Sequence, residues 1–583
     1  MDQTRLFTAI IVSIVILLGW QLVATRYLPH PPPPVEQTEQ TPLAKTATPA
    51  EGGPAAGVPA SPAAVAAARN VPRLRIAAPS VRGSLSLQGA RLDDIVLNHY
   101  RDTTAPDSPD VQLLAPLANA HPYFVQFGWS APAGAETKLP DDSTLWTASA
   151  PELSPEHPVT LSWNNGAGLD FRILLSIDDN YMFSVKQEVT NNTNTPVHLF
   201  PWQRIRRDYT PETSGYYLLF EGLLGLSHGT LQEWKYPQTK DGAKDKPDDV
   251  AYASTGDGGW GGITDKYWLT ALIPEQSVPT TLRYRYIPGG DGHYQVDYVT
   301  ADPVTIAPGA TSTNPTMLFT GAKVVNLLQQ YQDEYHIPRF VDTVDWGWFY
   351  FLTKPIFYCL DFLNGVLGNF GLAIIVFTVC VKLLFFPLAN YSYRSMSKMR
   401  LLSPKIQSLR ERFKDDPAKL QQEMMGLYRT EKINPASGCL PMIVQIPVFF
   451  SLYKDIFVTI EMRQAPFYGW IHDLSQVDPT NVFNLFGLIP FDPTTISPFL
   501  HLGAWPLMMG FSMWLQQRLN PPPPDPTQAK LFQFMPVIFT FMLARFPAGL
   551  VIYWTTNNLL SVAQQWVILK RTKLSRPGLA RTT

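Results

Sequence analysis

Lys382 is the residue whose type and surroundings most clearly suggest chemistry in this sequence. It lies in the apolar run 374–388 (IIVFTVCVKLLFFPL), six residues before the end of that run, at a depth of about 9 Å if the run is a membrane-spanning helix. A lysine in the middle of a membrane costs about 2.5–3.5 kcal/mol on insertion scales. Two interpretations remain open: the side chain reaches the lipid headgroups, or it places a positive charge in a water-filled cavity.

Polar side chains in other apolar runs could complete such a cavity. Thr378 lies one helical turn before Lys382, and Gln445 lies inside the run 441–447 (PMIVQIP). In the last apolar run a polar stripe at helical spacing is formed by Asn557, Ser561, Gln564 and Gln565. The same residues could instead hydrogen-bond between helices, and the two roles are compatible. No stripe has the Asp, Glu and His relay that a proton pump needs.

The apolar runs that must position these residues predict six transmembrane helices. The first, within residues 1–24, is flanked by Arg5 and Arg26, and we interpret it as a retained anchor rather than a cleaved signal peptide. The other five are predicted at 370–388, 439–460, 496–516, 531–546 and 549–569. Lys354 and Pro355 interrupt residues 345–364, which predict an amphipathic helix in the membrane interface rather than a further crossing.

Polar residues dominate the part between the first and second apolar runs. The Pro- and Ala-rich residues 25–70 predict a semi-rigid linker. Residues 71–340 alternate with period two between turn signals, as in 281–286 and 294–298 around a glycine-rich turn, and predict a large β-sandwich. All three cysteines lie after residue 345, so this part has no disulfide. Neither a carboxylate pair nor a ligand spacing predicts an enzyme, a metal site or a cofactor.

Lysine and arginine are distributed unevenly over the predicted loops. Residues 389–438 and the tail 570–583 are rich in cations, whereas residues 461–495 carry only Arg463. The positive-inside rule places the first two segments in the cytoplasm and the third outside. With six crossings, both termini are therefore predicted to be cytoplasmic and residues 71–340 to lie outside.

The loop 389–438 predicts a cytoplasmic helical hairpin whose second helix begins at Asp416 and Pro417. Methionines suit contact with varied apolar segments, and cations suit ribosomal RNA or anionic lipid. The candidate residues of these two kinds are Met396, Met399, Arg400, Lys405, Met424 and Met425. Packing of the two helices and membrane topology would also account for them.

Several stretches resemble the YidC/Oxa family of membrane protein insertases. They are 390–407 (NYSYRSMSKMRLLSPKIQ), 422–428 (QEMMGLY), 463–467 (RQAPF), 471–475 (IHDLS), 534–540 (FMPVIFT) and 546–551 (FPAGLV). The resemblance covers about 340–572 in order. An N-terminal anchor followed by a large β domain resembles the Gram-negative branch of the family. The adjacent Lys454 and Asp455 are not a family pattern.

The resemblance implies a multi-pass α-helical fold, with a five-helix insertase core around a hydrophilic groove and a periplasmic β-supersandwich. One cation of the first core helix lies in the groove of such proteins, often as arginine. Arginine stays ionised, whereas a desolvated lysine can lose its proton. The groove residues that match the family are Lys382, Thr378, Gln445, Trp554 and Asn557. Ser561 is added to this set from the polar stripe.

The implied function is to insert and chaperone nascent transmembrane segments in the inner membrane, alone or with the Sec translocon. The implied partners are nascent membrane proteins, the Sec translocon, the ribosome and signal recognition particle pathway, and inner-membrane lipids. One alternative is a secondary transporter, which predicts inverted repeats that are not found in the sequence. The other is a membrane-anchored periplasmic carbohydrate-active protein, which predicts a carboxylate pair in residues 71–325.

Overall fold

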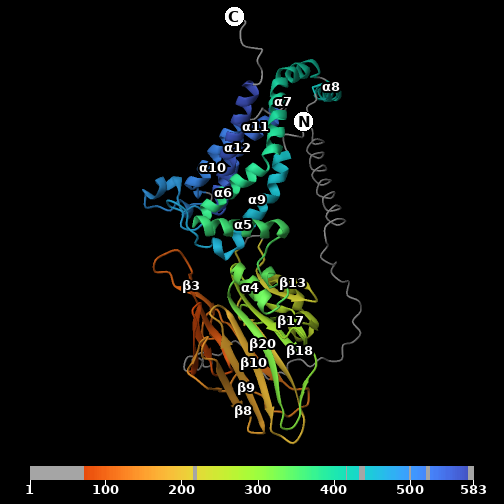
Figure 1. The fold of residues 1–583 in the computed structure, drawn as a ribbon, viewed down its shortest axis with the longest axis vertical. Coiled ribbons are helices and arrows are strands. Elements are labelled where there is room, and N and C mark those ends of the chain that lie inside the picture. The colour runs from red at the N-terminus through yellow and green to blue at the C-terminus, as the bar shows by residue number, and fades with distance from the viewer. Residues whose placement is uncertain are drawn as a thin grey trace.

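The computed structural model describes residues 71–214, 219–414, 416–431, 440–497, 500–519 and 526–574. A β part and a helical part lie one after the other along the long axis (Figure 1). The predicted anchor (1–24), the predicted linker (25–70) and the end of the predicted basic tail lie outside the described residues, so their structures stay predictions.

The β part consists of two large, mostly antiparallel sheets. The 11-stranded sheet contains β1 (Arg73–Ala77), β2 (Val81–Ser86), β3 (Arg91–Arg101), β4 (Asp110–Leu114), β5 (Tyr123–Ser130), β7 (Glu152–Leu153), β11 (Val197–Arg207), β14 (Val250–Asp257), β17 (Pro279–Ile287), β18 (His293–Thr300) and β19 (Val304–Ile306). The nine-stranded sheet contains β6 (Thr147–Ala148), β8 (Val159–Asn164), β9 (Leu169–Ile177), β10 (Met182–Asn191), β12 (Gly222–Ser227), β13 (Thr230–Lys235), β15 (Trp260–Thr264), β16 (Trp268–Pro274) and β20 (Thr311–Ala322). The predicted hairpin is confirmed, because β17 and β18 pair with Tyr284 opposite Val296.

Alternating side chains of the two sheets share one hydrophobic core. Leu85 and Phe127 from the first sheet and Leu175, Phe183 and Leu318 from the second line the same small interior space. In β9 every second residue is buried, which is the pattern expected of a strand with one face on a core. The β part is therefore held by apolar packing between sheets.

The helices within and after the β part are α3 (Tyr236–Ala243), α4 (Val325–Glu334), α5 (Tyr350–Leu367), α6 (Phe370–Leu384), α7 (Phe386–Arg412), α8 (Pro417–Thr430), α9 (Leu440–Val458), α10 (Ala504–Leu519), α11 (Pro526–Leu543) and α12 (Ala548–Leu574). Short 3-10 turns occur at η1 (Pro247–Asp249), η2 (Phe340–Thr343), η4 (Ile460–Met462), η5 (Val482–Gly487) and η6 (Pro493–Thr495). Within the described chain, no helix taken singly has the length and apolar character of a membrane crossing; α6 and the start of α7 meet these criteria jointly, with a 66° bend between them.

The predicted spans 439–460, 531–546 and 549–569 correspond to α9, α11 and α12 with shifted ends, and two other predicted spans differ more from the observed helices. The span predicted at 370–388 breaks at Phe385, because Pro387 lies at the start of α7 and disfavours a continuous helix through the preceding residues. The span predicted from 496 begins only at Ala504. There the Thr480 hydroxyl accepts a hydrogen bond from the Ala504 amide at 2.9 Å, and the Asp478 carboxylate accepts one from the Trp505 amide at 2.8 Å. These caps come from a loop distant in sequence.

Helix α5 crosses the base of the helical part, next to the β part (Figure 1). It begins five residues after the start of the predicted interfacial segment 345–364 and ends three residues after the end of that segment. Its polar side chains contact the β side: Lys354 binds Asp342 at 2.6 Å and Asp361 accepts from Asn326 at 3.0 Å. Phe362 of α5 is exposed, and so is Trp348, which lies two residues before the helix.

The outer end of α9 is fixed to the β part by polar contacts. The Lys454 ammonium lies 2.6 Å from the Asp345 carboxylate, and both side chains are mostly buried. The Glu461 carboxylate accepts a hydrogen bond from the Val325 amide at 2.9 Å. Lys266 lies 3.6 Å above the ring of Phe457, and burial lowers the pKa of the Lys266 amine to about 8. The two parts are therefore joined at specific residues of α9 and η4.

The Lys454–Asp345 pair predicts a coupled pair of substitutions. Asp345→Asn should lower the melting temperature of the full chain in detergent, because it removes the carboxylate 2.6 Å from the mostly buried Lys454 ammonium, and removing one partner of a buried charge pair costs up to about 3 kcal/mol. Adding Lys454→Met should recover most of this loss, since the charge is then gone. A double variant that is as unstable as the sum of the two single variants would show that the charges are not coupled.

Candidate functional site

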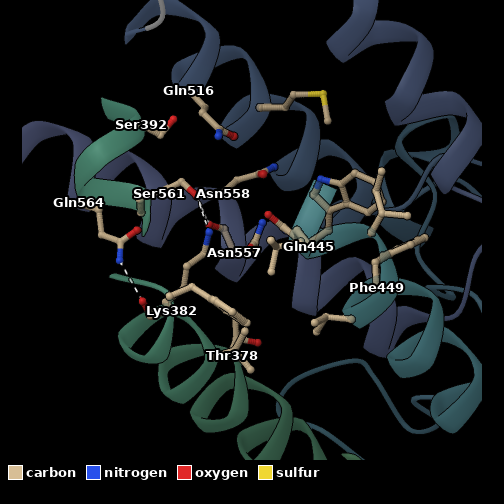
Figure 2. Close-up of a pocket in the computed structure, with 18 of the residues that line it drawn as sticks. Thr378, Lys382, Ser392, Gln445, Phe449, Gln516, Asn557, Asn558, Ser561 and Gln564 are labelled. Atoms are coloured by element: carbon tan, nitrogen blue, oxygen red, sulfur yellow. Dashed lines mark hydrogen bonds between the residues drawn. The ribbon is translucent and has the colours of Figure 1, made fainter. Parts of the chain in front are cut away.

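A cavity of about 540 Å³ lies between helices of the helical part. Residues of α6, α7, α9, α10, α11 and α12 line it, although these helices are distant in the sequence. Figure 2 labels ten of the lining residues, which surround one space. All six groove residues predicted from the sequence line this cavity, namely Lys382, Thr378, Gln445, Trp554, Asn557 and Ser561.

Lys382 extends from α6 toward α12, as Figure 2 shows. Its ammonium donates a hydrogen bond to the hydroxyl of Ser561 at 2.8 Å. The side chain of Gln564, one turn further along α12, donates to the backbone carbonyl of Lys382 at 3.4 Å. Because Ser561 is buried, the charge of Lys382 is held against the inner wall of the cavity in this structure.

The wall around Lys382 has unused capacity for hydrogen bonds. The hydroxyl of Ser392 and the side-chain carbonyl of Gln564 are buried and have no partner among the described residues. Gln445 and Gln516 also point toward the cavity (Figure 2). Buried polar groups without protein partners are usually satisfied by water. The arrangement therefore suits a hydrated space.

Two predicted polar residues already use their hydroxyl groups locally. Thr378 donates to the carbonyl of Ile374 at 2.6 Å, and Ser561 donates to the carbonyl of Asn557 at 2.8 Å. Such bonds to the preceding turn satisfy the donor while leaving lone pairs of the oxygen available to other donors. Ser561 uses one of these to accept from Lys382.

The other side of the cavity is aromatic and apolar. The indole of Trp554 meets the ring of Phe449 edge-to-face at 4.8 Å and the ring of Phe539 at 5.9 Å. Met535 of α11 lines the same side. The cavity thus has one polar, positively charged wall and one apolar wall, so it can contact both polar and apolar parts of a chain.

The sequence prediction missed several lining residues and included one polar residue that points elsewhere. Ser392, Gln516 and Asn558 line the cavity, and Asn558 donates to Ser512 of α10 at 3.1 Å. Gln565, from the predicted stripe, instead donates to the carbonyl of Leu519 at 3.0 Å. Two signals in the sequence could have indicated these residues: Asn558 directly follows Asn557, and Ser392 lies in the family-like stretch 390–407.

The predicted residues of the cytoplasmic hairpin separate into different environments. Met399 and Met424 pack against the small core between α7 and α8, whereas Met425 is exposed. Lys405 pairs with Glu431 at 3.0 Å across the hairpin, and Met396 lines the cavity. The side chain of Arg400 lies outside the described residues.

No group of three or more His, Cys, Asp or Glu residues suited to a metal ion occurs in the part of the chain that the structure describes. The arrangement around Lys382 can attract an anionic group and solvate polar groups. These are binding properties and need no bond-making step.

Comparison with known proteins gives matches over nearly the whole chain. Residues 362–575 match the family model described as 60Kd inner membrane protein, and residues 73–359 match that of the YidC periplasmic domain. The membrane protein insertase YidC of Granulibacter bethesdensis is 57% identical, with 100% of each chain covered. The corresponding protein of Acidiphilium cryptum is 54% identical, with 98% of each chain covered.

Solved structures give weaker matches. A crystal structure of an active YidC insertase with its first transmembrane domain resolved has 17% sequence identity and a TM-score of 0.35, over 85% of this chain and 92% of that one. A galactose mutarotase related enzyme from Lactobacillus acidophilus has 9% identity and a TM-score of 0.29, over 42% of this chain and 97% of that one.

Water in the cavity predicts a difference in thiol reactivity. In a chain whose three cysteines are replaced by serine, Asn557→Cys should react with a small charged thiol reagent, since the cavity admits water. Met509→Cys is the matched control, because Asn557 is 5% exposed and Met509, in a neighbouring apolar cluster, is 0% exposed. Both are measured in lipid nanodiscs, and equal, slow reaction at the two sites would contradict a hydrated cavity.

Proposed function

The chain belongs to the YidC family of membrane protein insertases, and we propose that it inserts its substrates by way of the polar cavity around Lys382. It is an inner-membrane insertase with a periplasmic β-rich domain, as its full-length relatives are. Those relatives are named insertases, so we favour insertion over the two alternatives, a transporter and a carbohydrate-active protein. The observation that carries the proposal is the convergence of charge, buried polar groups and an apolar wall on one cavity.

The polar wall lowers the cost of moving a substrate's polar tail into the membrane. A peptide group or hydroxyl that leaves water without a new partner costs roughly 2–7 kcal/mol. Ser392, Gln516 and Gln564, together with water, supply such partners within the helical part. Lys382 adds an attraction for acidic side chains of the tail, and this attraction is stronger where little water intervenes.

The substrate's apolar segment follows a different route. Helices α9 and α11 carry exposed apolar side chains that do not line the cavity, namely Ile443 of α9 and Phe534 and Val537 of α11. A transmembrane segment that slides along these side chains stays in contact with apolar groups until lipid surrounds it. Removal of its apolar surface from water then drives insertion, without a cofactor.

The remaining parts of the proposal concern topology and partners. We propose six crossings, with both termini and the hairpin of α7 and α8 in the cytoplasm. The uneven distribution of lysine and arginine supports this orientation. The exposed cations of the hairpin also suit contact with a ribosome, and delivery by the signal recognition particle pathway or cooperation with the Sec translocon is compatible with the same orientation.

The proposed orientation predicts where a membrane-impermeant thiol reagent reacts. Ser408 in α7 and Ser143 in the β part are both exposed, so either can be replaced by a reactive cysteine in the serine-substituted chain. In intact spheroplasts the reagent should modify Ser143→Cys and leave Ser408→Cys unmodified. Permeabilised membranes, in which both should react, are the control. If the reagent modified only Ser408→Cys in spheroplasts, the orientation would be the opposite of the one proposed.

The role of Lys382 predicts a dependence on the charge of the substrate. Lys382→Ala and Lys382→Glu should impair insertion of tails with Asp or Glu, for Lys382→Ala by roughly tenfold if about 1.4 kcal/mol of attraction is lost. Lys382→Arg should retain insertion because it keeps the charge. Neutral tails should be affected less, since their transfer depends on hydration of the cavity.

The measurement is protease protection of a translocated tail, in acidic and neutral versions, in cells depleted of the native protein. Lys398→Ala is the matched control, because Lys398 is an exposed lysine of α7. Unchanged insertion of both tails by Lys382→Ala would eliminate an electrostatic role and would indicate a lysine that only reaches toward headgroups.

A further inference from the structure

The loop between α9 and α10 exposes an unusual amount of apolar surface. We define the apolar loop as residues 481–497, which include η5 and η6. Its large exposed apolar side chains are Phe483, Leu485, Phe486, Leu488, Ile489, Phe491 and Ile496, with Leu488 83% and Ile496 71% exposed. By contrast, Leu145 is the one large exposed apolar residue among the described residues of the β part.

Hydrogen bonds hold the loop in this exposed conformation. At its base, the Asn481 side chain donates to the carbonyl of Leu500 at 2.8 Å, and the Val482 amide donates to the carbonyl of Leu502 at 2.9 Å. Leu485 and Phe486 have φ angles of 53° and 60°, in the left-handed region that bulky residues rarely adopt. The Phe486 amide donates to the carbonyl of Asn481 at 2.8 Å, which supports this conformation.

Charge is nearly absent from the apolar loop. Asp492 is its one charged residue, and the Asp492 carboxylate accepts hydrogen bonds from the amide and hydroxyl of Thr494 at 2.9 and 2.7 Å. Loops that are exposed to water normally carry charged and small polar side chains. A contiguous group of exposed apolar side chains instead marks contact with another apolar phase. The loop therefore has the composition of a segment that is withdrawn from water.

The position of the loop identifies that phase. It connects the outer end of α9 to α10, and α10 carries outward-facing apolar side chains, such as Met508, Phe511 and Trp514. In Figure 1 the light-blue segment before α10 extends sideways from the helices, near the height of α5. Helix α5 presents Phe362 and Val366 outward as well.

We propose that the apolar loop is embedded in the outer leaflet of the membrane and forms, with α5, a collar at the outer boundary of the helical part. The lipid occupant follows from continuity with the exposed apolar surface of α10 and from the presence of only one charged residue, Asp492, in the loop. Aromatic side chains such as Phe483 and Phe491 suit this interfacial depth. The inference does not depend on the role of the polar cavity.

The experiment places a nitroxide spin label on single cysteines of the full chain, in which Cys359, Cys380 and Cys439 are replaced by serine. The chains are placed singly in nanodiscs of phosphatidylethanolamine and phosphatidylglycerol. Leu488→Cys is compared with Phe511→Cys on lipid-facing α10 and with Leu145→Cys on the β part, since all three positions are exposed in the structure. Collision with oxygen reports lipid, and collision with a water-soluble nickel chelate reports water.

The Leu488 label is expected to collide with nickel several-fold less, and with oxygen several-fold more, than the Leu145 label, and to resemble the Phe511 label. Nickel collision at Leu488 equal to that at Leu145 would overturn the proposal. Protection that is found in crowded vesicles but lost in single-copy nanodiscs would assign the surface to a second copy of the chain, and would also overturn it.

A second variant tests the embedding without relying on one labelled side chain. With the label on Ile496→Cys, the added substitution Leu488→Asp should draw the loop toward water and raise nickel collision at 496. Leu145→Asp is the matched control and should leave that collision unchanged. A loop already in water would show no response to Leu488→Asp, which would contradict the proposal.

Discussion

The cost of leaving a polar group without a partner in hydrocarbon governs the helical part of this protein. Each peptide or hydroxyl group in lipid needs a partner within the protein or water held by it. The helices satisfy this constraint by turning Lys382, Asn557 and Ser561 toward one shared cavity and Phe534 and Val537 outward. An insertase must offer the same solution to its substrate. The polar wall that satisfies the protein's own groups is therefore also the surface that we propose for the substrate's tail.

The two ends of α9 serve different purposes. Its inner half lines the cavity through Gln445 and Phe449. Its outer end binds the β part through Lys454 and Asp345, and Glu461 of the following turn accepts from Val325. Breaking a charge pair that has little water around it is costly, because it leaves a buried charge without that partner. The β part thus fixes the orientation of one cavity wall without contributing a side chain to the cavity.

Breaks in the helices shape the cavity as much as the helices do. The 66° bend between α6 and α7 brings Ser392 and Met396 of α7 to the same space as Lys382 of α6, which a straight helix would carry away from it. At α10, the late start at Ala504 leaves an apolar segment outside the helix instead of within it. Proline at the first break and capping by Asp478 and Thr480 at the second are the local causes.

The sequence by itself determined the apolar runs, the pairing of strands around glycine-rich turns, the family, and the six residues that line one cavity. Helical spacing and the unfavourable placement of Lys382 are local properties of the chain and indicated the polar residues, whereas Trp554 was indicated by the family resemblance alone. Only the tertiary structure decided that the Lys382 ammonium meets Ser561, that Gln565 faces α10, and that Lys454 meets a β-part carboxylate. It also decided where α10 begins. These contacts join residues from 24 to 179 positions apart. Their formation depends on how whole helices pack, because a one-residue rotation of a helix changes which neighbour a side chain meets.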